Sequence, residues 1–193
     1  MIIDLLNEQE KKLVKLSTYK EGEILFYEND VCYTLGIVKS GEITISSITF
    51  TGNEIIYNRL TKGQMFGNNL LFSSDNKYRG DVKASYKCEV YLINKDNLRK
   101  ILMNNEAFLN EYLAIQSNFA RSLNTKIKLL SFTSAKERFL YYLFVNNNHI
   151  KFKNVTTLSQ SLFLTREVTS RLISKLVDEG IIKRNKNEIL LLN

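Results

Sequence analysis

Glycine is confined to one stretch of the chain, and this placement constrains the fold more than any other feature. Seven of the eight glycines fall between Gly22 and Gly80, and only Gly180 lies beyond them. Glycine tolerates the positive φ angles of tight turns, so closely spaced glycines mark short strands joined by turns. The segments between them are alternating or β-branched runs: residues 24–27, 35–38, 42–45, 54–57 and 88–93. This pattern predicts an antiparallel β-barrel, with hairpin turns at residues 39–42 and 50–53.

The pattern becomes helical from Lys95 on. Apolar side chains then recur every three or four residues in a segment without glycine: Phe108, Tyr112, Ile115, Phe119, Leu123, Ile127 and Leu130. This spacing is close to a coiled-coil repeat, and it predicts a long helix whose seam meets the same helix of a second copy. A helix buried wholly within one chain is the alternative.

Capping signals define three further helices. Ser134 followed by Glu137 is a capping box for a helix that reaches about Val145. Asn154 is positioned to cap a short helix, residues 163–164 form a turn, and Thr165 is positioned to cap a helix over residues 166–178. Gly180 suits the end of that helix, and a hairpin with a basic tip is expected over residues 181–191.

The charge of the chain is concentrated at its C-terminal end. Residues 131–193 carry 10 Lys/Arg against 5 Asp/Glu, whereas residues 1–130 carry 17 against 15. A basic segment favours a phosphate-bearing partner, because each Lys or Arg that contacts a phosphate releases condensed counterions. A merely soluble basic surface is the alternative interpretation.

Polar residues gather on the outer face of the expected helix over 166–178. The apolar positions Val168, Leu172, Ile173, Leu176 and Val177 share one face, and Thr169 is expected on the opposite one. Arginine can bond guanine bidentately and glutamate can accept from the cytosine amino group, so this face is suited to reading bases in a major groove. A solvated amphipathic helix followed by an unrelated hairpin is the alternative. The candidate DNA-binding residues are Asn154, Thr156, Thr165, Arg166, Glu167, Ser170, Arg171, Lys175, Lys183 and Arg184.

Residues 165–171, Thr-Arg-Glu-Val-Thr-Ser-Arg, resemble the recognition-helix signature of the Crp/Fnr family of bacterial transcription regulators. Residues 22–26, 37–42 and 63–67 are similar to the cyclic-nucleotide-binding β-barrel of that family. The resemblance implies an α+β protein with an N-terminal antiparallel β-barrel (jelly roll) over 1–103, a dimerisation helix over 104–130 and a winged helix-turn-helix over 131–193. It also implies a homodimer that binds double-stranded DNA, with Phe108, Tyr112, Ile115, Phe119, Leu123 and Ile127 at the interface. Phe163 stands where the family often has glycine in the turn.

The same resemblance places a candidate effector pocket at Gly67, Asn68, Asn69, Tyr78 and Arg79. Relatives that bind cyclic AMP use a glutamate for the ribose and an arginine for the phosphate. Here Asn68 follows Gly67, and Tyr78 occupies the phosphate position, so no response to cyclic AMP is expected. The chain is therefore expected either to bind DNA constitutively or to respond to an unidentified small-molecule effector.

Other function classes find little support. Cys32 and Cys88 are too few for a disulfide framework or a four-cysteine cluster, although a redox switch between them stays open. The single histidine, His149, is expected in a surface loop, and no catalytic constellation is found. We expect no enzyme, no cofactor, no metal and no membrane partner, and a cytoplasmic location. RNA polymerase is a candidate partner, although no sequence pattern defines a surface for it. The alternative function is a cyclic-nucleotide-binding-type sensor module that acts through protein contacts.

Overall fold

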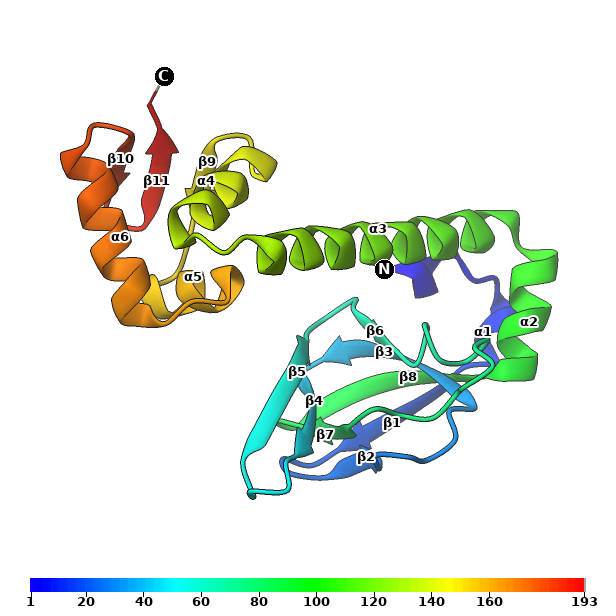
Figure 1. Ribbon diagram of the computed structural model, residues 1–193. Helices are drawn as coiled ribbons and strands as arrows, with labels where there is room; N and C mark the ends of the chain where they lie inside the picture. The colour runs from blue at the N-terminus through cyan, green and yellow to red at the C-terminus, as the bar shows by residue number, and fades with distance from the viewer. Residues whose placement is uncertain (193) are drawn as a thin grey trace. The chain divides into compact units, whose positions relative to one another are not determined.

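Two antiparallel four-stranded sheets form the body of the N-terminal unit, Met1–Ser117, in the computed structural model, which describes residues 1–192 (Figure 1). The strand orders are β1-β8-β3-β6 and β2-β7-β4-β5. The strands are β1 (Lys15–Tyr19), β2 (Ile24–Phe26), β3 (Thr34–Ser40), β4 (Ile43–Ile48), β5 (Glu54–Leu60), β6 (Met65–Phe66), β7 (Asp81–Ala84) and β8 (Cys88–Asn94). The predicted antiparallel jelly roll is confirmed.

The core of this unit lies between the inner faces of the two sheets. On β8, Cys88 and Val90 are buried on either side of the half-buried Glu89; on β7, Val82 and Ala84 are buried on either side of the exposed Lys83. This alternation follows from the period of two that puts successive side chains on opposite faces of a strand. Burial of the apolar faces of these two strands stabilises the fold by about 25 cal/mol per Å² of apolar surface.

The two predicted hairpin turns have different outcomes. The turn at 50–53 joins β4 to β5, which pair antiparallel, so that hairpin is confirmed. The turn at 39–42 does contain a left-handed residue, Gly41, with φ 82°, and a Cβ there would lie 2.5 Å from the Lys87 carbonyl oxygen. However, β3 and β4 belong to different sheets, so this turn crosses between sheets and is not a hairpin.

Two strands of the barrel were not expected. β1 is mostly exposed and polar, and β7 is short and follows an irregular segment. Neither offers a long apolar alternation. β1 is held instead by its pairing with β8, from Lys15 opposite Leu92 to Tyr19 opposite Cys88.

Helices precede and follow the barrel. The 3₁₀ helix η1 (Ile2–Leu5) and α1 (Glu8–Lys11) come first, and α2 (Lys95–Asn104) and α3 (Glu106–Ser131) come after β8. Asn105 joins the last two helices: its Oδ1 accepts from the Phe108 backbone N–H at 2.9 Å, and its Nδ2 donates to Glu10 at 2.8 Å. The predicted long helix over 108–130 is confirmed. The helical pattern that begins at Lys95 also contains α2, for which the sequence predicts no separate bounds.

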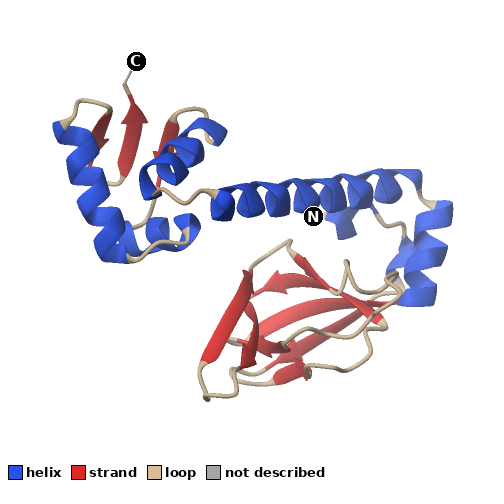
Figure 2. Cartoon of the chain, viewed as in Figure 1, coloured by secondary structure: helices blue, strands red, loops and turns tan. Residues whose placement is uncertain are grey.

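The C-terminal unit, from Asn118 on, contains helices and a small sheet of order β10-β11-β9 (Figure 2). Its elements are α4 (Ala135–Val145), β9 (His149–Lys151), α5 (Val155–Leu162), α6 (Arg166–Asp178), β10 (Ile182–Asn185) and β11 (Glu188–Leu191). The predicted helices and the predicted hairpin are confirmed. The loop expected at His149 is wrong, because β9 pairs with β11 and puts His149 opposite Leu190.

The core of this unit unites the three helices with the sheet. It contains Phe139, Leu143, Leu158, Ile173, Leu176 and Ile189, all nearly or fully buried. Within residues 1–192, no helix is both long enough and apolar enough to cross a bilayer.

Candidate nucleic-acid interface

The N-terminus of α5 is fixed by a reciprocal cap. The Asn154 side chain accepts from the Thr157 backbone N–H at 2.9 Å, and Thr157 Oγ1 accepts from the Asn154 backbone N–H at 3.2 Å. Such a cap satisfies free backbone donors and stabilises a helix by about 1 kcal/mol. Asn154 and Thr156 are both exposed at this helix end, where backbone N–H groups favour a negatively charged ligand.

The turn between α5 and α6 contains a left-handed phenylalanine. Phe163 has φ 53° and ψ 42°, and the backbone N–H of Leu164 donates to the Ser159 carbonyl at 3.0 Å. A residue with a Cβ adopts this conformation at a cost of about 1–2 kcal/mol. The turn therefore keeps the positive φ that glycine would supply, although the residue is not glycine.

Both ends of α6 are capped as the sequence predicts. Thr165 Oγ1 accepts from the Val168 backbone N–H at 3.2 Å. At the other end Gly180, with φ 69°, donates to the Val177 carbonyl at 3.0 Å, and Ile181 donates to the Leu176 carbonyl at 2.9 Å. This pair of bonds is a Schellman motif, in which glycine at the left-handed position avoids a strained Cβ.

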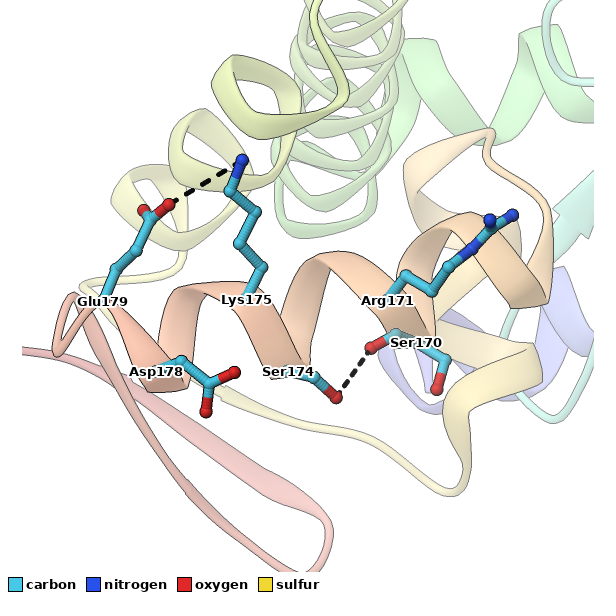
Figure 3. A pocket seen from close by; sticks show the side chains of 6 residues that line it. All are labelled: Ser170, Arg171, Ser174, Lys175, Asp178 and Glu179. Carbon is cyan, nitrogen blue, oxygen red and sulfur yellow. Dashed lines mark hydrogen bonds and ion pairs between the residues drawn. The ribbon is translucent and has the colours of Figure 1, made fainter.

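Five of the predicted contact residues form an exposed row on α6: Arg166, Glu167, Ser170, Arg171 and Lys175. Figure 3 shows the C-terminal part of this row, where a shallow groove runs between Arg171 and Glu179. Thr169 does not join it. Its side chain is fully buried and donates to the Thr165 carbonyl at 3.0 Å, because position 169 shares the inner face with Ile173. The expectation for Thr169 is wrong.

Acidic neighbours divide the basic residues into paired and unpaired ones. Glu179 bonds Lys136 at 2.7 Å and lies 3.8 Å from Lys175; the Lys136 hydrogen bond lowers the pKa of the Glu179 carboxyl. Lys151 likewise pairs with Glu188 at 3.0 Å. Among residues 1–192, the cations that form no ion pair include Arg166, Arg171, Lys183 and Arg184.

The hairpin β10–β11 carries the remaining predicted contacts. Lys183 and Arg184 are exposed on β10, and Lys186 at the tip has a left-handed φ of 46°. Arg184 Nε donates to the Lys186 carbonyl at 3.4 Å, which fixes the tip. Lys186 was not among the predicted contacts, although its place in a basic tip was the signal for it.

The five predicted effector-pocket residues do not converge on one cavity. Tyr78 is buried beside Gly67 and stacks on Phe26, with ring centroids 5.0 Å apart. Its hydroxyl has no hydrogen-bond partner in the described residues, and burial raises the Tyr78 pKa. Asn69 and Arg79 are exposed, and Arg79 is paired with Asp75 at 2.5 Å.

Asn68 is turned toward α3 and bonds it directly. The Asn68 amide donates to Gln116 Oε1 at 2.7 Å. The backbone carbonyl oxygen of Asn68 accepts from Gln116 Nε2 at 2.9 Å and from the Tyr112 hydroxyl at 3.3 Å. Gln116 was missed at the sequence level, since a polar residue in an apolar seam gives no sign of a partner 48 positions away.

The predicted dimer seam on α3 divides into a buried and an exposed part. Phe108 and Tyr112 are buried in the core of their own barrel, and Ile115 packs against it. Phe108 and Tyr112 are therefore wrong as interface residues, because almost no surface is left for a partner. Farther along, Phe119 is half-buried. The large apolar side chains that α3 exposes are Leu113, Leu123, Ile127 and Leu130.

Comparison with known proteins finds regulatory proteins among those that are similar to this chain. Residues 16–105 match the family model "Cyclic nucleotide-binding domain". The anaerobic regulatory protein of Bacillus subtilis is 24% identical, over 98% of this chain and 86% of its own. The cAMP-activated global transcriptional regulator CRP of Haemophilus influenzae is 24% identical, over 91% and 83%. A solved CooA mutant from Carboxydothermus hydrogenoformans is 21% identical and has a TM-score of 0.65, over 94% of this chain and 85% of that one.

Proposed function

We propose that the chain is a transcription regulator of the Crp/Fnr family and that it acts as a homodimer that binds specific DNA sequences without cyclic AMP. In this proposal α6 enters the major groove. The observation that carries it is the set of exposed, unpaired cations on α6 and on the β10–β11 hairpin, Arg166, Arg171, Lys183 and Arg184.

The contacts divide into those that read bases and those that hold phosphates. Arg166 and Glu167 lie in the first turn of α6, the part of a recognition helix that reaches base edges. Arg166 is suited to guanine O6 and N7, and Glu167 to the cytosine amino group. Ser170, Arg171 and Lys175 continue the row. The DNA phosphate backbone is contacted by the start of α5, through Asn154 and Thr156, and by the β10–β11 hairpin (the wing), through Lys183 and Arg184. These contacts set the register of the protein on the DNA.

The second copy is expected along α3. Leu123, Ile127 and Leu130 are exposed and follow each other at spacings of four and three, which is the repeat of a coiled-coil seam. Two such helices bury these side chains against each other. The two-fold axis then presents two α6 helices to half-sites about one helical turn, roughly 34 Å, apart.

Independence from cyclic AMP is supported by what occupies the barrel. A ligand phosphate needs a guanidinium, and Tyr78 fills that position with a buried, uncharged ring. Arg79 faces Asp75 at the surface instead. The Asn68 amide, at the position of the ribose carboxylate, is already bonded to Gln116 of the same chain.

Selection of bound DNA from a random pool tests the proposal. The purified full chain, with no nucleotide added, is expected to enrich a sequence with two-fold symmetry and half-sites one helical turn apart. Addition of cell extract is expected to leave the sequence unchanged. No enrichment under either condition, or enrichment only with extract, contradicts ligand-independent binding.

A further inference from the structure

One arginine of α4 joins three backbone carbonyls that lie far apart in the sequence. Arg138 Nη2 donates to the Phe132 carbonyl at 2.7 Å. Its Nη1 donates to the Phe163 carbonyl at 3.0 Å and the Leu162 carbonyl at 3.4 Å. Its Nε is buried and has no hydrogen-bond partner among the described residues, while the side chain as a whole is half-buried. The planar fork of arginine offers donors in fixed directions, so one side chain bonds carbonyls on both sides of it.

At one end Arg138 holds the turn of the helix-turn-helix. Leu162 is the last residue of α5, and Phe163 is the left-handed residue that follows it. The final carbonyls of a helix lack intrahelical donors and carry partial negative charge, so a cation that is hydrogen-bonded to them stabilises them. The contact falls on the one residue of this turn that is strained by its Cβ.

At the other end Arg138 holds the connection between α3 and α4. Phe132 directly follows Ser131, the last residue of α3. Its ring packs against Tyr141 of α4 at a centroid distance of 5.3 Å. Lys128, in the last turn of α3, lies over the same Tyr141 ring at 4.7 Å. The end of α3 is thus tied to α4 both by aromatic packing and by the guanidinium.

We propose that Arg138 is the positioning residue of DNA recognition: it fixes the left-handed turn at Phe163 and so sets the direction of α6 relative to α5. This inference rests on the DNA-binding function proposed above. Thr165, the cap of α6, is only two residues beyond Phe163, so a change of the Phe163 dihedral angles reorients the whole recognition helix. The same guanidinium makes that turn sensitive to the connection that follows α3.

Binding to the selected operator tests this role with a double-mutant cycle. Arg138→Gln removes the charge and the fork, and we expect about a tenfold loss of operator affinity or more. Arg138→Lys keeps the charge and one donor direction and is expected to lose less. Phe163→Gly relieves the backbone strain, so the loss caused by Arg138→Gln is expected to shrink to less than about threefold in the Phe163→Gly background. Equal losses in the two backgrounds would overturn the proposal.

Amide hydrogen exchange tests the clamp, meaning the hydrogen bonds from Arg138 to the Leu162 and Phe163 carbonyls, without DNA. The Leu164 N–H, which bonds the Ser159 carbonyl, is expected to lose protection in Arg138→Gln, while the Ile173 amide in the middle of α6 keeps it. Unchanged protection at Leu164 contradicts the clamp. Arg99→Gln, which removes an exposed arginine of α2, is the matched control and is expected to change neither readout.

The two tests separate the possible failures. A wild-type chain that binds no DNA, together with lost Leu164 protection in Arg138→Gln, contradicts the proposed function and leaves the clamp intact. Normal operator binding by a folded Arg138→Gln contradicts the clamp alone. Circular dichroism establishes folding first, and if Arg138→Gln does not fold, Arg138→Lys carries both measurements.

Discussion

Side chains on α6 and side chains on the β10–β11 hairpin are expected to have different roles in DNA binding, and single substitutions distinguish base reading from phosphate contact. Arg166→Ala is expected to cost about 1–3 kcal/mol of operator binding and to relax the preference at one base pair. Arg184→Ala is expected to weaken all sequences alike and to reduce the slope of log K against log[salt] by about one. Gel-shift titration on operator and random DNA, at several salt concentrations, measures both.

The Arg166 assignment has a clear opposite outcome. An equal loss on operator and on random DNA for Arg166→Ala makes Arg166 a phosphate contact and removes it from base reading. Glu8→Ala, far from α6 in the sequence and exposed on α1, is the control and is expected to leave both affinities unchanged.

Tyr78 and Asn68 lead to a prediction about small ligands. Calorimetry with cyclic AMP and with cyclic GMP is expected to show no binding in the micromolar range, because Tyr78 stands where a guanidinium is expected for the phosphate and the Asn68 amide is engaged by Gln116. Micromolar binding of either nucleotide, accompanied by tighter DNA binding, would show that this interpretation of Tyr78 and Asn68 is wrong. If neither nucleotide binds, an effector of other chemistry is the remaining source of regulation.

At the scale of elements, the exposed stripe of α3 is the expected interface. Leu123→Lys places like charges in an apolar contact between two copies, where they are desolvated and unpaired. The dimer is expected to dissociate and DNA affinity to fall sharply, while the temperature at which the barrel unfolds stays unchanged. Sedimentation measures the change, and Lys126→Ala, an exposed residue of the same helix, is the control. A dimer that persists in Leu123→Lys rules out this stripe.

The elements also show what a sequence can predict. Ser134, Asn154 and Thr165 cap their helices through bonds to residues three positions on, so a local pattern is enough to locate the helix starts. Strand partners are not local. The turn at Gly41 has the predicted backbone, but whether β4 pairs with β3 or with β5 is decided by packing between the sheets.

The candidate site follows the same rule. The exposed row on α6 was predictable from the helical period. The expectation for Thr169 was wrong because this polar residue lies on the buried face, where its hydroxyl donates to the Thr165 carbonyl. The bonds of Asn68 to Gln116 and of Arg138 to Phe163 join residues 48 and 25 positions apart. No spacing rule connects such pairs, and only the folded chain brings them together.

At the scale of the whole molecule, α3 carries two features whose angular separation about the helix axis depends on the number of residues between them. Gln116 is held to the barrel loop at Asn68, and Leu123, Ile127 and Leu130 form the stripe farther along the same uninterrupted helix. Each residue added between Gln116 and Leu123 turns the stripe by about 100° about the helix axis relative to Gln116 of the same helix. An insertion of about seven residues, or about 10 Å, therefore keeps the phase to within about 20°. An insertion of two residues would present Leu123 to the wrong side even though every local contact survived.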